Sequence, residues 1–149
     1  MNINSKDLLA WDIVSIALDD VDPTEKKYLS EIVYNSHDMK NMEELPGAFD
    51  SGEVLQYTSQ QLFFIIKYVL GIIAPVFLEK MVSISLDKLK EYFKDSHSNS
   101  KNVEYKINHS PDEVRKLVFA YCLKNKISRE TAEVIANAII VKLYLAESR

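Results

Sequence analysis

Four acidic side chains crowd into seven positions near the N-terminus, where their oxygen atoms could bind a cation or a basic protein surface. These residues, Asp19, Asp20, Asp22 and Glu25, are followed by Tyr28, a residue type enriched at protein interfaces. Carboxylates attract basic surfaces over a distance and raise the rate of encounter with them. The sequence therefore predicts that these five residues contact a partner protein with a basic surface.

The same segment matches the register of a calcium-binding loop only in part. Asp20, Asp22, Thr24 and Glu31 would take its first, third, fifth and twelfth positions. The sixth position needs glycine for a sharp turn, but Glu25 stands there, and a helix is predicted to start inside the loop. Helix capping and solvation explain these carboxylates more simply, so no metal site is predicted.

Other residues that serve as metal ligands or nucleophiles are scattered. His37, His97 and His109 lie in or beside polar stretches, and none has a second histidine three or four residues away, which favours surface positions. Cys122 lies on an apolar helical stripe, where burial disfavours the thiolate, so a small core residue is the simpler role. The sequence has no Gly-rich phosphate loop, Gly-x-Ser-x-Gly turn or His-Glu-x-x-His pair. We therefore expect no enzyme activity, catalytic residue, metal or cofactor.

The C-terminal part carries basic residues on two successive predicted helices, as a helix-turn-helix does. They are Arg115, Lys116, Lys124, Lys126, Arg129 and Lys142. Glu130 and Glu133, however, would occupy the first turn of the second helix, which has to meet phosphates and base edges. The net charge of −4 also disfavours nucleic acid as a partner. A DNA-binding regulator is therefore the second alternative function.

Charge is unevenly distributed along the 149 residues. Residues 1–60 hold four lysines against seven aspartates and five glutamates, whereas the remainder has 14 basic and 10 acidic residues. Hydrophobic residues at 47% and charged residues at 27% are typical of a globular domain, and one cysteine excludes an internal disulfide. We expect a single cytoplasmic helical domain over residues 1–149, with no secretory signal at its start.

The chain has only three glycines and four prolines, the residues that most often interrupt helices. We therefore expect helices to position the residues discussed above. Asp22-Pro23-Thr24-Glu25 is a start signal for a helix that ends near residues 35–37, and Ser110-Pro111-Asp112-Glu113 begins a helical hairpin over residues 110–147. Residues 8–18 fit a helix or a strand, and helix is favoured. Residues 102–108 alternate as in a strand, which needs a partner strand. Residues 95–101 read as a polar linker.

The run from Leu62 to Leu78 has Lys67 as its only charge. A helix that is apolar all round is typical of the centre of a bundle, although 17 residues also reach the lower limit for a membrane span. We favour core burial, because other predicted helices carry apolar stripes that need covering. Pro75 should kink or break the run near Gly71, which gives central apolar helices over residues 53–94, about 53–70 and 76–94.

The predicted fold is therefore mainly α: an irregular bundle of about five or six helices around a central apolar kinked helix, with room for one short strand pair. The favoured function is non-catalytic binding of another protein by an acidic bacterial or phage immunity or inhibitor protein, which masks its partner sterically. The alternative is a membrane-associated or membrane-active protein that uses residues 62–78. Any part of that segment left exposed would suit a homodimer face.

Overall fold

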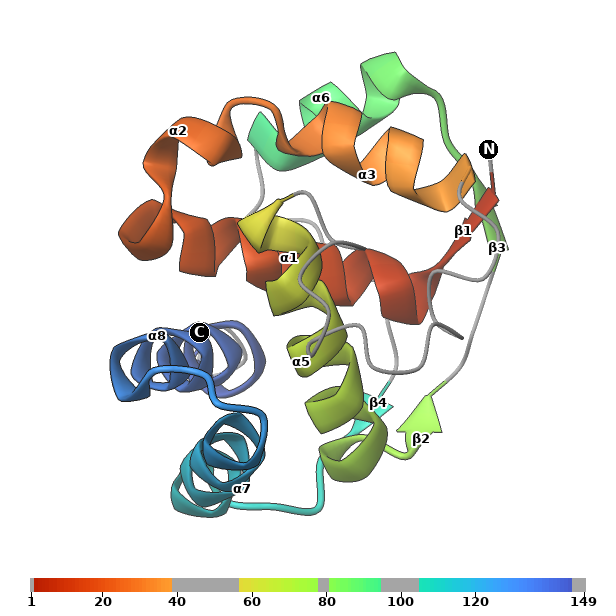
Figure 1. Cartoon of the computed structure of the whole chain (residues 1–149). Coiled ribbons are helices and arrows are strands. Elements are labelled where there is room, and N and C mark those ends of the chain that lie inside the picture. Colours follow the sequence, from red (N-terminus) through yellow and green to blue (C-terminus); the bar gives the residue numbers. More distant parts are fainter. Residues whose placement is uncertain (1, 39–56, 78–80, 95–104, 146–149) are drawn as a thin grey trace.

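Helices make up most of the structure (Figure 1). The computed structural model describes residues 2–38, 57–77, 81–94 and 105–145. Their helices are α1 (Ser5–Val21), α2 (Pro23–Lys26), α3 (Leu29–Asp38), α5 (Thr58–Ile73), α6 (Leu86–Lys94), α7 (Pro111–Lys124) and α8 (Arg129–Ile140), and a π-helical turn, η2 (Val141–Leu145), continues α8. The predicted mainly α bundle is confirmed.

Short antiparallel strands join segments that are distant in sequence. β1 (Asn2–Asn4) pairs with β3 (Met81–Ser83), and β2 (Val76–Phe77) pairs with β4 (Tyr105–Lys106). The prediction of a strand within residues 102–108 is confirmed for its described part by β4. The helix predicted over residues 76–94 is wrong in its first half, because β2 and β3 occupy that stretch and α6 begins only at Leu86.

The apolar run forms most of α5, and this helix ends just before Pro75. The helix stops at Ile73, and Ala74, which precedes Pro75, has φ −131° and ψ 62°, outside the helical region. The structure thus shows a break and not a kinked continuous helix. The first helical residue is Thr58, whereas the start predicted at residue 53 lies outside the described residues. Most of the apolar side chains of α5 are buried in the core, as predicted.

Helix α1 is as central as α5, which the sequence analysis did not predict. Figure 1 shows α1 crossing the middle of the molecule, with α3 and α6 on one side and α5, α7 and α8 on the other. All residues from Leu9 to Ser15 are buried, so neighbours cover every side of this helix. The helical interpretation of residues 8–18 is confirmed, and the bundle is built around two helices.

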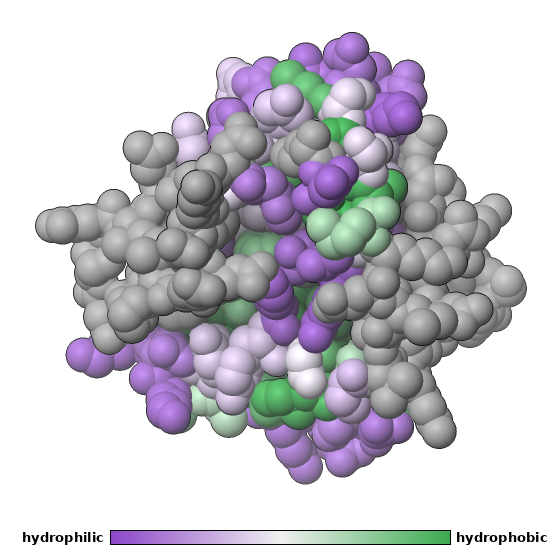
Figure 2. Space-filling view, turned by 90° about the vertical axis from the view of Figure 1, so that its right-hand side faces the viewer, coloured by the Kyte–Doolittle hydropathy of each residue, from purple (hydrophilic) through white to green (hydrophobic). Residues whose placement is uncertain are grey.

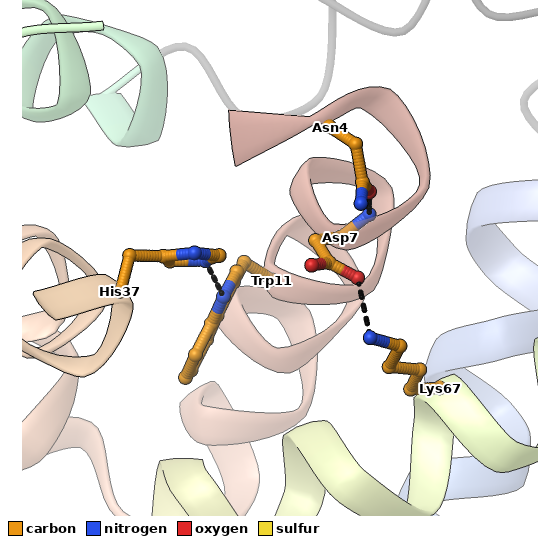
Figure 3. Close-up of polar contacts among 5 residues, drawn as sticks. All are labelled: Asn4, Asp7, Trp11, His37 and Lys67. Atoms are coloured by element: carbon orange, nitrogen blue, oxygen red, sulfur yellow. Dashed lines mark hydrogen bonds and ion pairs between the residues drawn. The ribbon is translucent and has the colours of Figure 1, made fainter. Parts of the chain in front are cut away.

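Two ion pairs attach α1 to α5 and to the C-terminal η2. Asp12 is fully buried and pairs with the buried Lys142 of η2. Asp7 pairs with Lys67 of α5 over 3.0 Å, and Figure 3 shows the two side chains pointing toward each other. Burial, and secondarily the charge of Asp12, raises the pKa of the Tyr92 hydroxyl on α6. The carboxylate of Asp12 therefore lies in a low-dielectric interior, where a charge needs a partner.

Trp11 joins α1 to α3 and α5. Its indole Nε1 donates a hydrogen bond to Nε2 of His37 over 3.3 Å (Figure 3), and its ring stacks on Phe63 with 4.2 Å between the centroids. The surface position predicted for His37 holds only in part, because this side chain is partly buried and accepts the bond from Trp11. His109 is also partly buried, and His97 lies outside the described residues.

The C-terminal helical hairpin predicted over residues 110–147 is confirmed by α7 and α8, up to Leu145, the last described residue. Ser110 and Glu113 form the expected capping box: Glu113 N donates to Ser110 Oγ at 3.2 Å and Ser110 N donates to Glu113 Oε1 at 2.9 Å. These bonds lower the pKa of Glu113. At the other end of α7, Lys126 takes a left-handed conformation with φ 59°, which reverses the chain toward α8.

Candidate binding pocket

A pocket of about 370 Å³ opens between α2, α3 and the first turn of α5. The volume is close to the lower end for small-molecule pockets, and suits one or two side chains of a partner. The described residues that line it come from two distant parts of the sequence: Glu25, Tyr28, Glu31, Ile32, Asn35, Ser36, Tyr57 and Gln60.

One wall is fixed by hydrogen bonds that start from the predicted helix cap. Asp22 accepts a bond from the backbone N–H of Glu25 over 3.1 Å, as the start signal required. Glu25 Oε1 then accepts bonds from Ser59 N at 2.8 Å and from Ser59 Oγ at 2.6 Å, at the N-terminal turn of α5. A carboxylate is favoured at that end of a helix by the helix dipole. Glu25 therefore links α2 to α5, and only one of its two oxygens takes part in this link.

The inner part of the pocket is fixed by a buried amide. Gln60 Nε2 donates to Ser36 Oγ over 3.1 Å, and Gln60 Oε1 accepts from the backbone N–H of Tyr57 over 3.2 Å. The side chains of Gln60 and Ser36 are both buried, so this contact joins α5 to α3 away from solvent. The pocket is thus held open by bonds within the chain and is already formed without a ligand.

The outer part of the pocket is aromatic and acidic. Tyr28 and Tyr57 are 56% and 44% exposed, and Glu31 and Asn35 are exposed as well. No lysine, arginine or histidine occurs among the described residues of the lining. Carboxylates attract positive charge, and the faces of tyrosine rings do the same. The arrangement is suited to binding a cationic group.

The pocket gathers two of the five residues predicted to contact a partner, Glu25 and Tyr28. Asp19 pairs with Lys26 over 2.7 Å, and Asp20 is exposed in the last turn of α1. Neither of these two lines the pocket, and Asp22 serves as the helix cap described above. Whether any of the five meets a partner stays a prediction.

Sequence reasoning missed the other lining residues. Glu31 and Asn35 follow Tyr28 by three and seven positions, which places all three on one side of a helix, so their spacing could have identified them. Tyr57 and Gln60 come from another helix, and only the tertiary fold brings them here. The pocket could not be found from local patterns alone.

Several basic side chains of the C-terminal hairpin contact other side chains of the protein. Four of the six residues considered for DNA binding make contacts with other side chains of the protein. These contacts join Arg115 to Asn137, Lys116 to Asp112, Arg129 to Phe119 and Lys142 to Asp12. Lys142 in particular is buried and does not belong to the surface.

Some large hydrophobic side chains are exposed on the described surface. In the part of the face in Figure 2 that described residues form, hydrophobic areas alternate with hydrophilic ones. Leu123 on α7 and Met81 on β3 are the most exposed of the large hydrophobic residues, at 81% and 65%. Among the described residues, no helix combines the length and the apolar character needed to cross a membrane. No group of three or more histidine, cysteine or acidic residues is placed there to hold a metal ion.

Cys122 lies inside the hairpin and should be unreactive. Burial raises the pKa of its thiol to about 11, so roughly one molecule in a thousand carries a thiolate at pH 8. We expect iodoacetamide to alkylate the folded protein at least about tenfold more slowly than the urea-unfolded chain, measured by mass spectrometry. Equal rates in the two states would show that the thiol is accessible and would contradict the buried position.

Comparisons with protein-family models, with curated proteins and with solved structures gave no match to this chain.

Proposed function

We propose that this protein binds another protein without catalysis and masks it sterically, in the manner of an immunity or inhibitor protein. The observation that carries the proposal is the pocket between α2, α3 and α5, with exposed tyrosines, two glutamates and no cationic residue in its described lining. A basic side chain of the partner enters this pocket. Asp20, exposed in the last turn of α1, adds negative charge that steers the partner toward it.

The arrangement of charge supports this choice over nucleic acid. The acidic residues of α1, α2 and α3 include exposed carboxylates, whereas Lys142 of the C-terminal hairpin is buried against Asp12 and Arg115 is hydrogen-bonded to Asn137. A phosphate backbone needs clustered, accessible cations. A basic protein surface instead needs clustered, accessible carboxylates.

The clearest test uses Glu31, because it is exposed and forms part of the rim. Charge reversal at Asp22 or Glu25 would also remove a helix cap or the link to α5, so a loss of binding there would be ambiguous. Glu31→Lys changes the charge of the pocket alone. Its matched control is Glu133→Lys, the same change at an exposed position on α8.

Wild type, Glu31→Lys and Glu133→Lys serve as baits in a lysate of the source cells at low salt. We expect a basic protein to be retained by wild type and by Glu133→Lys and to be lost with Glu31→Lys. Once it is isolated, its association rate with Glu31→Lys should be at least about tenfold lower than with wild type, by surface plasmon resonance. Retention of the same proteins by all three baits, or an association rate independent of salt, would refute the proposal.

A further inference from the structure

We infer that the pocket selects arginine over lysine: it binds the guanidinium group of one arginine side chain of a partner protein. This inference rests on the proposed function, and it assigns the chemistry of the group recognised. The argument depends on the number of acceptors, the aromatic rings and the volume of the pocket.

The pocket offers more hydrogen-bond acceptors than an ammonium group can use. Glu25 binds Ser59 through Oε1 alone, which leaves its second oxygen outside that contact. Glu31, Asn35, Tyr28 and Tyr57 also line the pocket, and their side chains carry further oxygen acceptors. A guanidinium has five N–H donors in a fixed planar fork, whereas an ammonium has three on a single nitrogen. The spread of acceptors over α2, α3 and α5 matches the wider group.

The aromatic rings favour the same ligand. Tyr28 and Tyr57 line the pocket from two different segments, and both rings are partly exposed in the unbound protein. A planar guanidinium stacks on a tyrosine face while its edge still donates to carboxylates, which a strongly hydrated ammonium does less well. At about 370 Å³ the pocket has room for the planar group beside the rings.

The inner surface of the pocket does not compete for the ligand. The amide of Gln60 is already bound to Ser36 and to the backbone of Tyr57. The amide therefore holds α3 and α5 in place, and recognition is left to the carboxylates and the rings. Because the pocket is already formed, binding has only a small free-energy cost for ordering the protein.

The test titrates the full chain with N-acetyl-arginine methylamide and, separately, with N-acetyl-lysine methylamide, by NMR of the backbone amides. We expect the arginine compound to shift the amides of Tyr28, Glu31 and Asn35, with a Kd on the order of 1 mM. The lysine compound should bind at least about fivefold more weakly, because it lacks the planar fork.

Two variants and a control locate the site. Glu31→Gln keeps the shape and removes the charge, and Tyr28→Leu removes the ring; each should weaken arginine binding at least about fivefold. Glu133→Gln, an exposed glutamate on α8, should leave it unchanged. Equal binding of the two compounds, no binding of either, or shifts outside the pocket would overturn the inference. The lysate experiment is separate: a partner lost with Glu31→Lys but without arginine selectivity leaves the proposed function standing, whereas arginine binding without such a partner removes the masking role alone.

Discussion

Lys142→Ala is expected to lower the free energy of unfolding by about 3–5 kcal/mol, because it leaves the fully buried Asp12 carboxylate without its ammonium partner. Removing one member of a buried ion pair costs far more than the pair itself contributes, since the remaining charge stays in a low-dielectric interior. Such a loss is a large share of the roughly 5–15 kcal/mol that stabilises a domain of this kind.

Urea unfolding followed by the fluorescence of Trp11, the only tryptophan, measures this loss. The matched control is Lys116→Ala, which breaks an exposed pair with Asp112 and should cost about 0–1 kcal/mol. In Asp12→Leu/Lys142→Met both charges are replaced by apolar groups, so this variant should be more stable than Lys142→Ala. A Lys142→Ala variant no less stable than Lys116→Ala would show that the pair is not buried.

Trp11→Ala is expected to lower the free energy of unfolding by about 3–5 kcal/mol, because it empties a large volume at the centre of the molecule. The indole is completely buried, stacks on Phe63 and donates a hydrogen bond to His37. Its removal therefore loosens α1 from both α3 and α5. Partial collapse of neighbouring side chains will decide where in this range the value falls.

Circular dichroism must follow the unfolding of this variant, since it lacks the fluorophore. Trp11→Phe retains an aromatic ring opposite Phe63 and loses the N–H donor, so it should cost less than alanine, about 1–3 kcal/mol. Leu123→Ala removes a side chain that is 81% exposed and should change stability by less than about 0.5 kcal/mol. Equal stability of Trp11→Ala and Leu123→Ala would contradict the placement of α1.

Local signals in the sequence predicted the ends of helices well. Asp22 and Ser110 each cap a helix where a start was expected, and Pro75 follows the end of α5. The single helix predicted from Asp22 to residues 35–37 is wrong, however, because α2 ends at Lys26 and a separate α3 begins at Leu29. The first half of the stretch after Pro75 was wrongly predicted as helix, because Val82 continues the helical spacing of Leu86 and Leu89, which do lie on α6. Strand β3 forms there because β1, which begins at residue 2, supplies its backbone partners. A pairing over such a sequence distance leaves no trace in a local window.

Buried charges were the second difficulty. Lys67 counted as an isolated charge in an apolar run, and Lys142 as one of six basic surface residues, yet both pair with aspartates of α1. One signal was available: Asp12 lies between Trp11 and Ile13, and Lys142 follows Val141. A charge inside an apolar stretch of each of two helices indicates a buried pair, although the sequence alone does not say which charges meet.

Only two residues of the candidate site were predicted from the sequence. Glu25 and Tyr28 were identified from charge and residue type, and both line the pocket. The sequence analysis did not foresee that Glu25 would bind Ser59, because that contact spans 34 positions. The tyrosine and the amide from the start of α5 were beyond reach for the same reason.

The Asp12–Lys142 pair also governs how this chain can fold while it is being made. The carboxylate and its ammonium lie 130 positions apart, so at ribosomal speeds of about 5–20 residues per second the first helix waits on the order of ten seconds for its partner. During that interval the side of the first helix that packs on α8 is open to aggregation or to capture by a chaperone. Native packing around the first helix is therefore completed after synthesis of almost the whole polypeptide, and nascent fragments that stop before residue 142 should be conspicuously prone to degradation.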